Sequence, residues 1–374
     1  MFRHVFRNIK HVTPKNNTTK MNVPMFNSYN KSHLISLKFG NSFCLPKMSS
    51  FSGTKHHHDH DHHHHHEHGC GCDHDHDHDH HHHHETEDGI LFNKSIELFS
   101  EGKIEEAIEN LKKTIEINPH HINAYLVLGG LFNISGKFND AKSVYAKTVE
   151  LFPKESICYG AWGNLLLNTK DYQEAVEKLQ KAIELSPNTY QTYLDLGIGL
   201  YQLGKKDEAM EQFKKATEIN PEYSEVYAEW CKILAEKENF EEAVQKISKA
   251  AELDPNNAQN FIIWGNILFK LAKAHQKAES EPATSVKTYG EAAEKFLQAT
   301  KCDPSRVETH FLLGLSLGKL KKYEESINAF KMGFSKLSRV PDDLKELVSD
   351  ENVRNDPGKV FQELDVFFSP KFNL

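Results

Sequence analysis

From residue 89 onward, apolar and charged residues alternate with the spacing of amphipathic helices. Prolines punctuate this pattern at a constant interval, at Pro119, Pro153, Pro187, Pro221 and Pro255, and Pro304 follows after a longer one. The constant interval, about 34 residues, lies in the range of stacked helical repeats. Because proline cannot continue a helix and disfavours helical geometry in the residue before it, each proline should follow the end of a helix. The pattern predicts helix–turn–helix units that repeat at this interval and stack on one another.

Small and large residues also recur at fixed places in this unit. When the proline is numbered 32, small residues fill position 8 in most units and aromatic or aliphatic residues fill position 24. Glycine inside a helix costs about 1 kcal/mol relative to alanine, so glycine at position 8 needs a packing reason. We expect the two helices of a unit to approach closely there. Position 8 is Ser95, Gly129, Gly163, Gly197, Cys231, Gly265 and Gly314; position 24 is Leu111, Tyr145, Leu179, Phe213, Ile247, Phe296 and Phe330.

These positions resemble the tetratricopeptide-repeat (TPR) family, whose pattern W–LG–Y–A–F–A–P runs in the same register. The resemblance implies an all-α fold, a right-handed superhelical α-solenoid of helix–turn–helix repeats. It covers residues 89–340, and the repeats are expected at about 88–121, 122–155, 156–189, 190–223, 224–257, 258–306 and 307–340. The sixth repeat contains an insert around 271–288, which either lengthens both helices or projects as a loop. All three tryptophans, Trp162, Trp230 and Trp264, occupy position 7 and are expected in the core.

The C-terminal segment, residues 341–374, is predicted to form capping helices on the last repeat. Asp342 is a candidate cap for a short helix that contains Leu344 and Leu347. Asp356-Pro357-Gly358 is typical of a turn. Apolar residues then recur at helical spacing from Val360 to Phe368. The alternative is an amphipathic segment that occupies the groove of this protein or of a partner.

In TPR proteins the first helices of the repeats line a concave groove through positions 2, 5, 6, 9 and 12. The resemblance therefore implies a partner groove that mixes apolar and acidic side chains. Such a surface suits an amphipathic protein or peptide segment with apolar anchors and some basic character. The alternative is that some of these residues are simply buried between repeats. The candidate groove residues are Asn164, Gln191, Leu194, Asp195, Ile198, Tyr201, Glu225, Glu229, Lys232, Gln259, Ile262, Asn266, Phe269 and Phe311.

One TPR subfamily binds the acidic, EEVD-type tails of heat-shock chaperones through a clamp of lysine, asparagine and arginine residues. In this chain Asn164 matches the clamp, but Asp195, Glu225 and Glu229 follow where polar or cationic residues are required. Carboxylates repel an acidic tail, so charge disfavours such a partner. Residues 89–374 carry 36 Lys and Arg against 43 Asp and Glu, which also disfavours nucleic acid. No apolar run approaches the length of about 20 residues that spans a bilayer, so no transmembrane segment is expected.

Residues 1–55 form a basic leader. Residues 1–58 contain nine Lys and Arg and no Asp or Glu. Phe2, Val5, Phe6 and Ile9 line one face of a helix, and Arg3, Arg7 and Lys10 lie elsewhere around it. An acid-free, amphipathic, Arg-bearing start is typical of an organellar presequence, which predicts a mitochondrial or other organellar location if translation begins at Met1. A later start would abolish the signal, and the alternative location is cytoplasmic.

Residues 56–88 are a low-complexity tract rich in His and Asp, which is predicted to be disordered because it cannot bury a core. Imidazole and thiolate groups bind zinc, nickel or copper, so the tract is a candidate site for these metals, although none is expected to be required. It contains 18 of the 25 histidines. The candidate ligands are His56, His57, His58, His60, His62, His63, His64, His65, His66, His68, Cys70, Cys72, His74, His76, His78, His80, His81, His82, His83 and His84.

We find no Gly-rich phosphate loop, HExxH or GxSxG motif, and His121 and His310 are isolated, so no enzyme activity is expected. The sequence favours a protein–protein interaction scaffold or adaptor that binds a partner segment in the groove. The alternative is a metal buffer or metallochaperone, in which the histidine tract binds the metal and the repeats dock the recipient.

Overall fold

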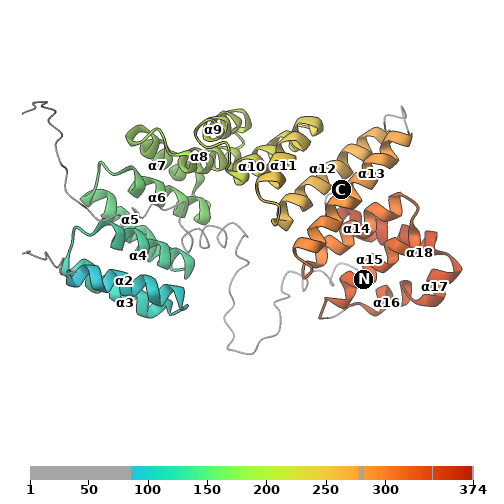
Figure 1. Cartoon of the computed structure of the whole chain (residues 1–374), viewed down its shortest axis with the longest axis horizontal. Helices are drawn as coiled ribbons and strands as arrows, with labels where there is room; N and C mark the ends of the chain where they lie inside the picture. Colours follow the sequence, from blue (N-terminus) through green and yellow to red (C-terminus); the bar gives the residue numbers. More distant parts are fainter. Residues whose placement is uncertain (1–85, 278–281, 339, 373–374) are drawn as a thin grey trace, which may run out of the picture. The chain divides into compact units, whose positions relative to one another are not determined.

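A computed structural model of the chain describes residues 86–277, 282–338 and 340–372 (Figure 1). All regular structure in these ranges is helical, and successive helices pack in pairs, which confirms the predicted α-helical class. The predicted leader and every candidate metal ligand lie outside the described residues. The described chain comprises two units, residues 86–165 and 166–372, and the boundary falls inside helix α6 (Ser156–Thr169).

The first unit consists of helix pairs joined by short turns. Helix α2 packs against α3, α3 against α4, and α4 against α5. Its core contains Leu111, Ala124 and Tyr145, which are at most 2% exposed. The helices before α6 are α2 (Glu87–Ser100), α3 (Ile104–Ile117), α4 (Ile122–Ile134) and α5 (Phe138–Leu151).

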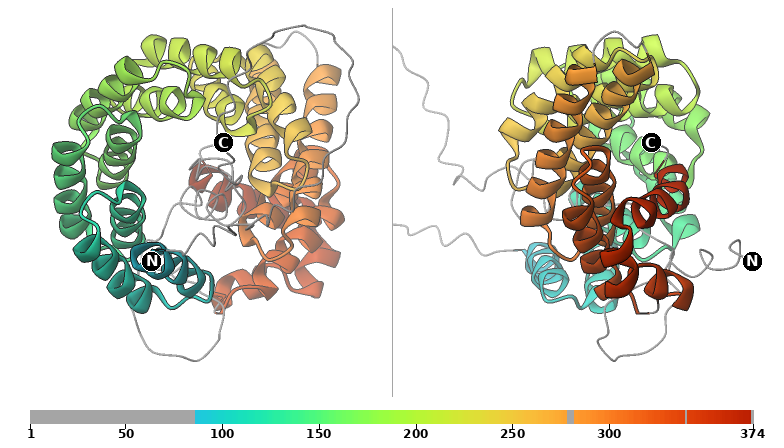
Figure 2. Two further views of the ribbon diagram at one scale, coloured as in Figure 1. Left: turned by 60° about the vertical axis from the view of Figure 1, so that its left-hand side comes forward. Right: turned by 90° about the vertical axis from the view of Figure 1, so that its right-hand side faces the viewer.

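The second unit continues the same arrangement, and the views in Figure 2 show its helices lying side by side in pairs. Each first helix of a pair also contacts the helix before it. The paired helices are α7 (Tyr172–Leu185), α8 (Tyr190–Gln202), α9 (Lys206–Ile219), α10 (Ser224–Glu236), α11 (Phe240–Leu253), α12 (Ala258–Lys277), α13 (Pro282–Cys302), α14 (Val307–Lys319) and α15 (Tyr323–Ser335).

The glycines at position 8 let an aromatic ring of the second helix lie directly on the backbone of the first. A Cβ atom placed on Gly197 would come within 2.4 Å of Phe213, and one placed on Gly265 would come within 2.5 Å of Phe296. Gly129 has the same relation to Tyr145 in the first unit, at 2.6 Å. The two helices of a pair therefore approach as closely as the recurrent glycines predict. The ring that packs on the glycine at position 8 belongs to the residue at position 24.

The turn between the two helices of a pair carries a residue with positive φ at position 15. Gly102, Gly136 and Gly204 adopt φ values of 73–81°, and Lys170, Glu238 and Lys321 adopt values of 58–66° at the equivalent places. The next amide closes the turn; for example, the N–H of Asn239 donates to the carbonyl of Leu234 at 2.9 Å. Three turns thus hold a side chain in a conformation that disfavours L-residues.

Replacing Glu238 with glycine is expected to stabilise the second unit by about 0.5 to 1 kcal/mol, because relief of the left-handed conformation exceeds the entropy that glycine adds to the unfolded chain. Chemical denaturation followed by circular dichroism measures this change. Glu238→Ala removes the same charge but keeps Cβ, so it should give no such gain. Equal effects of the two substitutions would contradict the explanation.

The insert in the sixth repeat lengthens both helices of that pair. Helices α12 and α13 contain 20 and 21 residues, against 13 or 14 in the other helices of the pairs. The added turns pack against each other: Ser285 Oγ donates to the carbonyl oxygen of Ala272 at 2.9 Å, and the Tyr289 hydroxyl to Gln276 Oε1 at 3.3 Å. Of the two alternatives from the sequence, longer helices are therefore the one observed.

The C-terminal segment forms α16 (Asp342–Leu347), α17 (Asp350–Asn355), α18 (Pro357–Phe368) and a short 3-10 helix, η3 (Ser369–Lys371). Two details of the prediction were wrong. Asp342 lies inside α16, and Pro341 occupies the capping position. Pro357 and Gly358 begin α18 rather than forming a separate turn, because the Asp356 carboxylate caps that helix by accepting from the Lys359 N–H at 2.9 Å.

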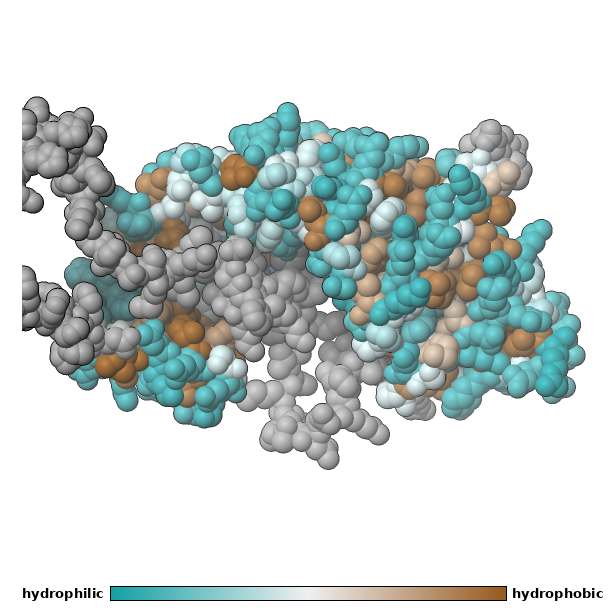
Figure 3. All heavy atoms as spheres, in the orientation of Figure 1, coloured by the Kyte–Doolittle hydropathy of each residue, from teal (hydrophilic) through white to brown (hydrophobic). Residues whose placement is uncertain are grey.

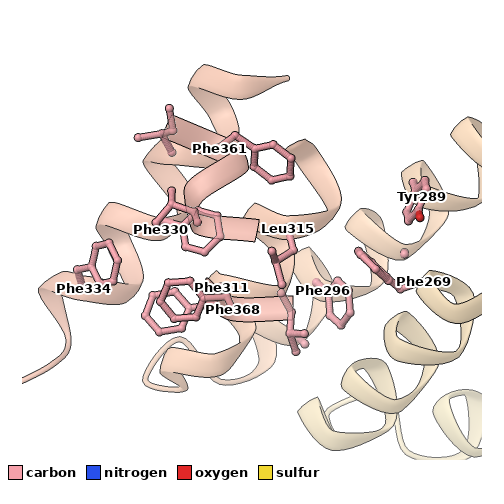
Figure 4. Close-up of a cluster of buried hydrophobic side chains, with 14 of the residues drawn as sticks. Phe269, Tyr289, Phe296, Phe311, Leu315, Phe330, Phe334, Phe361 and Phe368 are labelled. Carbon is pink, nitrogen blue, oxygen red and sulfur yellow. The ribbon is translucent and has the colours of Figure 1, made fainter. Parts of the chain in front are cut away.

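Helix α18 packs against α14 and α15 and completes an aromatic cluster (Figure 4). The ring of Phe368, 1% exposed, lies 4.6 Å from that of Phe311 and 5.2 Å from that of Phe330. Phe361 covers Gly318, and Lys319 Nζ pairs with Asp365 Oδ2 at 2.6 Å. The hydrophobic surface at the end of α14 and α15 is thereby covered by the chain itself.

The tryptophans contact the core but are only half-buried. Lys246 Nζ lies 3.9 Å from the centre of the Trp230 ring, and Lys295 Nζ lies 3.8 Å from that of Trp264. The lysine therefore covers the part of the ring that the core leaves open. The prediction that these residues are core residues holds for their contacts with the core cluster, but their rings are not fully enclosed.

Candidate functional site

The first helices of three successive pairs form one continuous surface in the second unit. Helix α10 contacts both α8 and α12. Side chains at the groove positions of these helices therefore lie on neighbouring elements. Asn164, another predicted groove residue, lies in α6 and belongs to the first unit.

Burial divides the predicted groove residues into two groups. Leu194, Ile262, Phe269 and Phe311 are 0–6% exposed, so they are not available as anchors for a partner. Phe269 packs on Tyr289 of α13 at 4.9 Å, and Phe311 belongs to the aromatic cluster with α18. Their assignment to the groove has to be corrected, because neighbouring helices bury them; the sequence analysis had left this alternative open.

The remaining candidates are partly exposed or form the polar floor of the surface. Figure 3 shows that, on the face it displays, hydrophobic residues of the described chain form separate patches within a hydrophilic surface. Asp195 and Glu229 are buried, at 5% and 8% exposed, beneath partly exposed neighbours. We call this surface the A-helix face; it comprises Gln191, Asp195, Ile198, Tyr201, Glu225, Glu229, Lys232, Glu236, Gln259, Asn266 and Lys270.

Tyr201 connects α8 to α10 at the centre of the A-helix face. Its hydroxyl donates a hydrogen bond to Glu236 Oε1, and Lys206 Nζ pairs with Glu236 Oε2 at 2.9 Å. Partial burial and the neighbouring Glu236 raise the pKa of Tyr201 to about 12, so the phenol stays neutral and acts as a donor. Although burial opposes it, the hydrogen bonds from Tyr201 and Lys206 hold the pKa of Glu236 below its usual value. Glu236 is therefore ionised at neutral pH.

A second polar group lies at the start of α8 and α10. The Tyr223 hydroxyl donates to Glu225 Oε2 at 2.7 Å, and the Tyr223 ring lies 4.9 Å from that of Tyr190. Gln191 Nε2 donates to Asp195 Oδ1 at 3.4 Å. Burial and, after it, the nearby Glu225 raise the pKa of Tyr223. The carboxylates in this group thus accept hydrogen bonds from uncharged donors of their own helices and turns.

Helix α12 contributes amide side chains. Arg306 Nη1 donates to Gln259 Oε1 at 2.7 Å, which holds this amide at the start of α14. The Asn266 side-chain oxygen is buried and has no hydrogen-bond partner among the described residues. On α10, Lys232 pairs with Glu229. The A-helix face is consequently rich in hydrogen-bond acceptors, several of which are held by side chains of the same or neighbouring helices.

Sequence reasoning missed Glu236, Lys206, Lys270 and Tyr223. Glu236 and Lys270 occupy position 13, one residue beyond the last position that the family pattern assigns to the groove. Lys270 lies close enough to Glu236 that its positive charge contributes to lowering the pKa of Glu236. Extending the groove pattern by one residue, to position 13, would have included Glu236 and Lys270. Nothing in the sequence indicates Lys206, which lies at the start of the second helix of its pair.

His121 and His310, which are isolated in the sequence, have structural roles. His121 Nδ1 accepts from the Ala124 N–H at 3.2 Å and so caps α4. His310 is 8% exposed, and burial lowers its pKa, which keeps the ring neutral near pH 7.

The paired helices and the face on their first members define a helical-repeat protein with a polar surface that includes apolar residues. Residues 89–121 match the tetratricopeptide repeat family, which supports the resemblance seen in the sequence. Residues 167–236 match the family of regulator of microtubule dynamics protein 1-3. This second match runs from the end of α6 to the end of α10 and includes most of the A-helix face.

Several solved structures are similar to this chain. A tetratricopeptide repeat protein from Parabacteroides merdae is 14% identical, with a TM-score of 0.49, over 74% of this chain and 98% of its own. PilF of Pseudomonas aeruginosa is 21% identical, with a TM-score of 0.48, over 63% of this chain and 96% of its own. YrrB, described as a TPR protein with an unusual peptide-binding site, is 22% identical, with a TM-score of 0.39, over 53% of this chain and 95% of its own.

No curated protein sequence matches the chain. Within the described ranges, no helix combines the length and the apolar character needed to cross a membrane.

Proposed function

We propose that this chain is a non-catalytic interaction scaffold that binds a segment of another protein on the A-helix face. The observation that carries the proposal is the continuous surface over α8, α10 and α12, in which the partly exposed Ile198 and Tyr201 lie among fixed carboxylate and amide groups. Apolar contacts supply affinity, and polar groups that are already held in place supply orientation at a low entropic cost. The match to the tetratricopeptide repeat family supports the same class of function.

The partner segment should be amphipathic. Ile198 and Tyr201 offer apolar contact, whereas Glu225 and Glu236 favour a segment that carries hydrogen-bond donors. The same carboxylates disfavour EEVD-type chaperone tails and nucleic acid. The partner is therefore expected to be a protein or peptide with basic and apolar residues on one side.

The double substitution Ile198→Ala, Tyr201→Ala is expected to weaken partner binding by about 10- to 100-fold, because it removes both apolar contacts at the centre of the face. Affinity purification from cells with the full chain, quantified by mass spectrometry, measures the recovery of each partner. The matched control Tyr201→Phe keeps the ring and removes only the hydrogen bond to Glu236, so it should retain most binding. Unchanged recovery with the double variant, at wild-type helicity, would exclude this face as the binding site.

The metal-binding alternative depends on the composition of residues 56–84 alone. Titration of the full chain with zinc is expected to show several weak binding events, which disappear when residues 56–84 are deleted and weaken below about pH 6 as imidazoles protonate. Equal binding by the deletion variant would assign the zinc to the repeats and contradict the prediction for the tract.

A further inference from the structure

We propose that Ser369 is a phosphorylation site for a proline-directed protein kinase, and that its phosphate releases helix α18 from α14 and α15. This inference goes beyond the binding of a partner segment, because it concerns a different part of the second unit. It rests on the residue that follows Ser369, on the hydrogen bond that the serine hydroxyl makes, and on the position of that hydroxyl at the end of α18.

Ser369 has the local sequence and the exposure that such a kinase requires. Pro370 follows it directly, and proline at this place has a fixed φ and no N–H that the enzyme would have to satisfy. Ser369 is partly exposed, and Pro370 and Lys371 are exposed. These three residues form only the short 3-10 helix η3, so a kinase can bind them as an extended segment without breaking a longer helix.

The chain has two other hydroxyl residues followed by proline, which serve as comparisons. Thr13-Pro14 lies outside the described residues. Ser186-Pro187 lies in the turn between α7 and α8, and the Ser186 hydroxyl is 3.3 Å from the neutral hydroxyl of Thr189. A phosphate on Ser186 could accept a hydrogen bond from that neighbour. Ser369 differs from Ser186 because its hydroxyl contacts a carboxylate.

The Ser369 hydroxyl belongs to a bridge that holds the end of α18 on α14. It donates to Asp365 Oδ1 at 2.6 Å, and Lys319 Nζ donates to Asp365 Oδ2, also at 2.6 Å. The residue before Ser369 is Phe368, whose ring packs in the aromatic cluster with α14 and α15 (Figure 4). A change at Ser369 therefore acts on the polar and the aromatic contacts of α18 together.

Phosphorylation replaces the hydroxyl with a group that the neighbouring carboxylate repels. In the kinase, the Ser369 oxygen attacks the γ-phosphorus of ATP, and a new O–P bond forms. The bond from that phosphorus to the bridging oxygen breaks, ADP leaves with the electron pair, and the hydroxyl proton passes to a base of the kinase. Asp365 thereby loses its hydroxyl donor, and about 1.5 to 2 negative charges appear beside its carboxylate.

The last turn of α18 does not offset this charge. It contains no basic residue, and the C-terminal end of a helix carries a partial negative charge. Lys319 supplies one positive charge, which already pairs with Asp365. Lys371 lies against the Phe367 ring, with its Nζ 3.0 Å from the ring centre. Repulsion should therefore displace the end of α18, and the ring of Phe368 should leave the cluster with it.

The site is tested on the full chain with a purified cyclin-dependent kinase, ATP and Mg²⁺. The variant Thr13→Ala, Ser186→Ala leaves Ser369 as the one hydroxyl residue followed by proline. Mass spectrometry is expected to find phosphate on Ser369 in this variant, and incorporation of radiolabelled phosphate should be lost when Ser369→Ala is added. Absence of phosphate on Ser369, or incorporation that does not depend on it, overturns the site.

The effect of the phosphate is measured without the kinase, on full chains in which phosphoserine is incorporated at position 369 during translation. Hydrogen exchange of α18 is expected to be about 10-fold faster than in the unmodified chain. Phosphoserine incorporated at position 186 is the matched control and should leave exchange of α18 unchanged. Equal exchange of α18 with and without phosphoserine at position 369 overturns its release.

The variant Asp365→Asn tests whether charge repulsion is the cause. The amide keeps the shape of the side chain and removes its charge, so Lys319 can pair with the phosphate instead. Within this variant, phosphoserine at position 369 should accelerate exchange of α18 by less than about 2-fold. An acceleration as large as in the chain with Asp365 would contradict the proposed mechanism, because loss of the hydroxyl would then be sufficient.

Discussion

Replacing Gly197 with alanine is expected to lower the free energy of unfolding of the second unit by about 1 to 2 kcal/mol, although alanine is the better helix former. The added Cβ would lie 2.4 Å from the Phe213 ring. That ring is 1% exposed and cannot swing into solvent, so either α8 and α9 must separate or the ring must leave its preferred position. The steric cost of about 1 to 3 kcal/mol exceeds the gain in helix propensity.

Gly290 provides a matched control for Gly197. It lies inside α13, and nothing is within 4 Å of a Cβ atom placed on it. Gly290→Ala should therefore stabilise the chain by about 0.5 to 1 kcal/mol through helix propensity alone. Urea denaturation followed by circular dichroism compares the two variants. Stabilisation by both would show that the contact between Gly197 and Phe213 does not limit the distance between the helices.

Replacing Phe368 with alanine is expected to destabilise the C-terminal part of the second unit by about 3 to 5 kcal/mol. The side chain is 1% exposed and contacts Phe311, Phe330 and Phe334 from α14 and α15. Its loss leaves a cavity in the contact that holds α18, so α18 should detach and expose the ends of α14 and α15. Hydrogen exchange should show early deprotection of α16–α18, and a hydrophobic dye should bind more strongly.

Val366 is the control on the same helix. It is 79% exposed, so Val366→Ala should change stability by no more than about 0.5 kcal/mol and should not increase dye binding. Identical exchange profiles for Phe368→Ala and the wild type would mean that the cluster is not what holds α18 in place. Because repeat proteins unfold by neighbouring units, the effect of Phe368→Ala should fade toward α7.

The A-helix face could be predicted only in part from the sequence. Positions 2 and 9 hold the partly exposed Gln191, Glu225, Gln259 and Asn266, as the family pattern implies. Position 6 was no guide to exposure, because Asp195 and Glu229 at this position are buried. Position 5 was misleading, because Leu194 and Ile262 at this position are buried. A family pattern states which way a side chain points from its own helix, whereas exposure depends on how closely the next helix approaches. The same reason explains why Glu236 at position 13 was missed, since its hydrogen bonds to Tyr201 and Lys206 connect helices that are distant in sequence.

The constant spacing of prolines, with small residues at position 8, was enough to predict paired helices, because helix ends and close contacts depend on local residue types. It could not distinguish longer helices from a loop in the sixth repeat, since both accommodate the inserted residues. That outcome depends on contacts such as that between Ser285 and Ala272, which form only when α12 and α13 lie side by side. Likewise, the apolar spacing from Val360 to Phe368 predicted a helix, but not that Phe368 would close a cluster with Phe311, which lies far earlier in the chain. Local patterns specify the helices, and the distances between helices specify which residues a partner can reach.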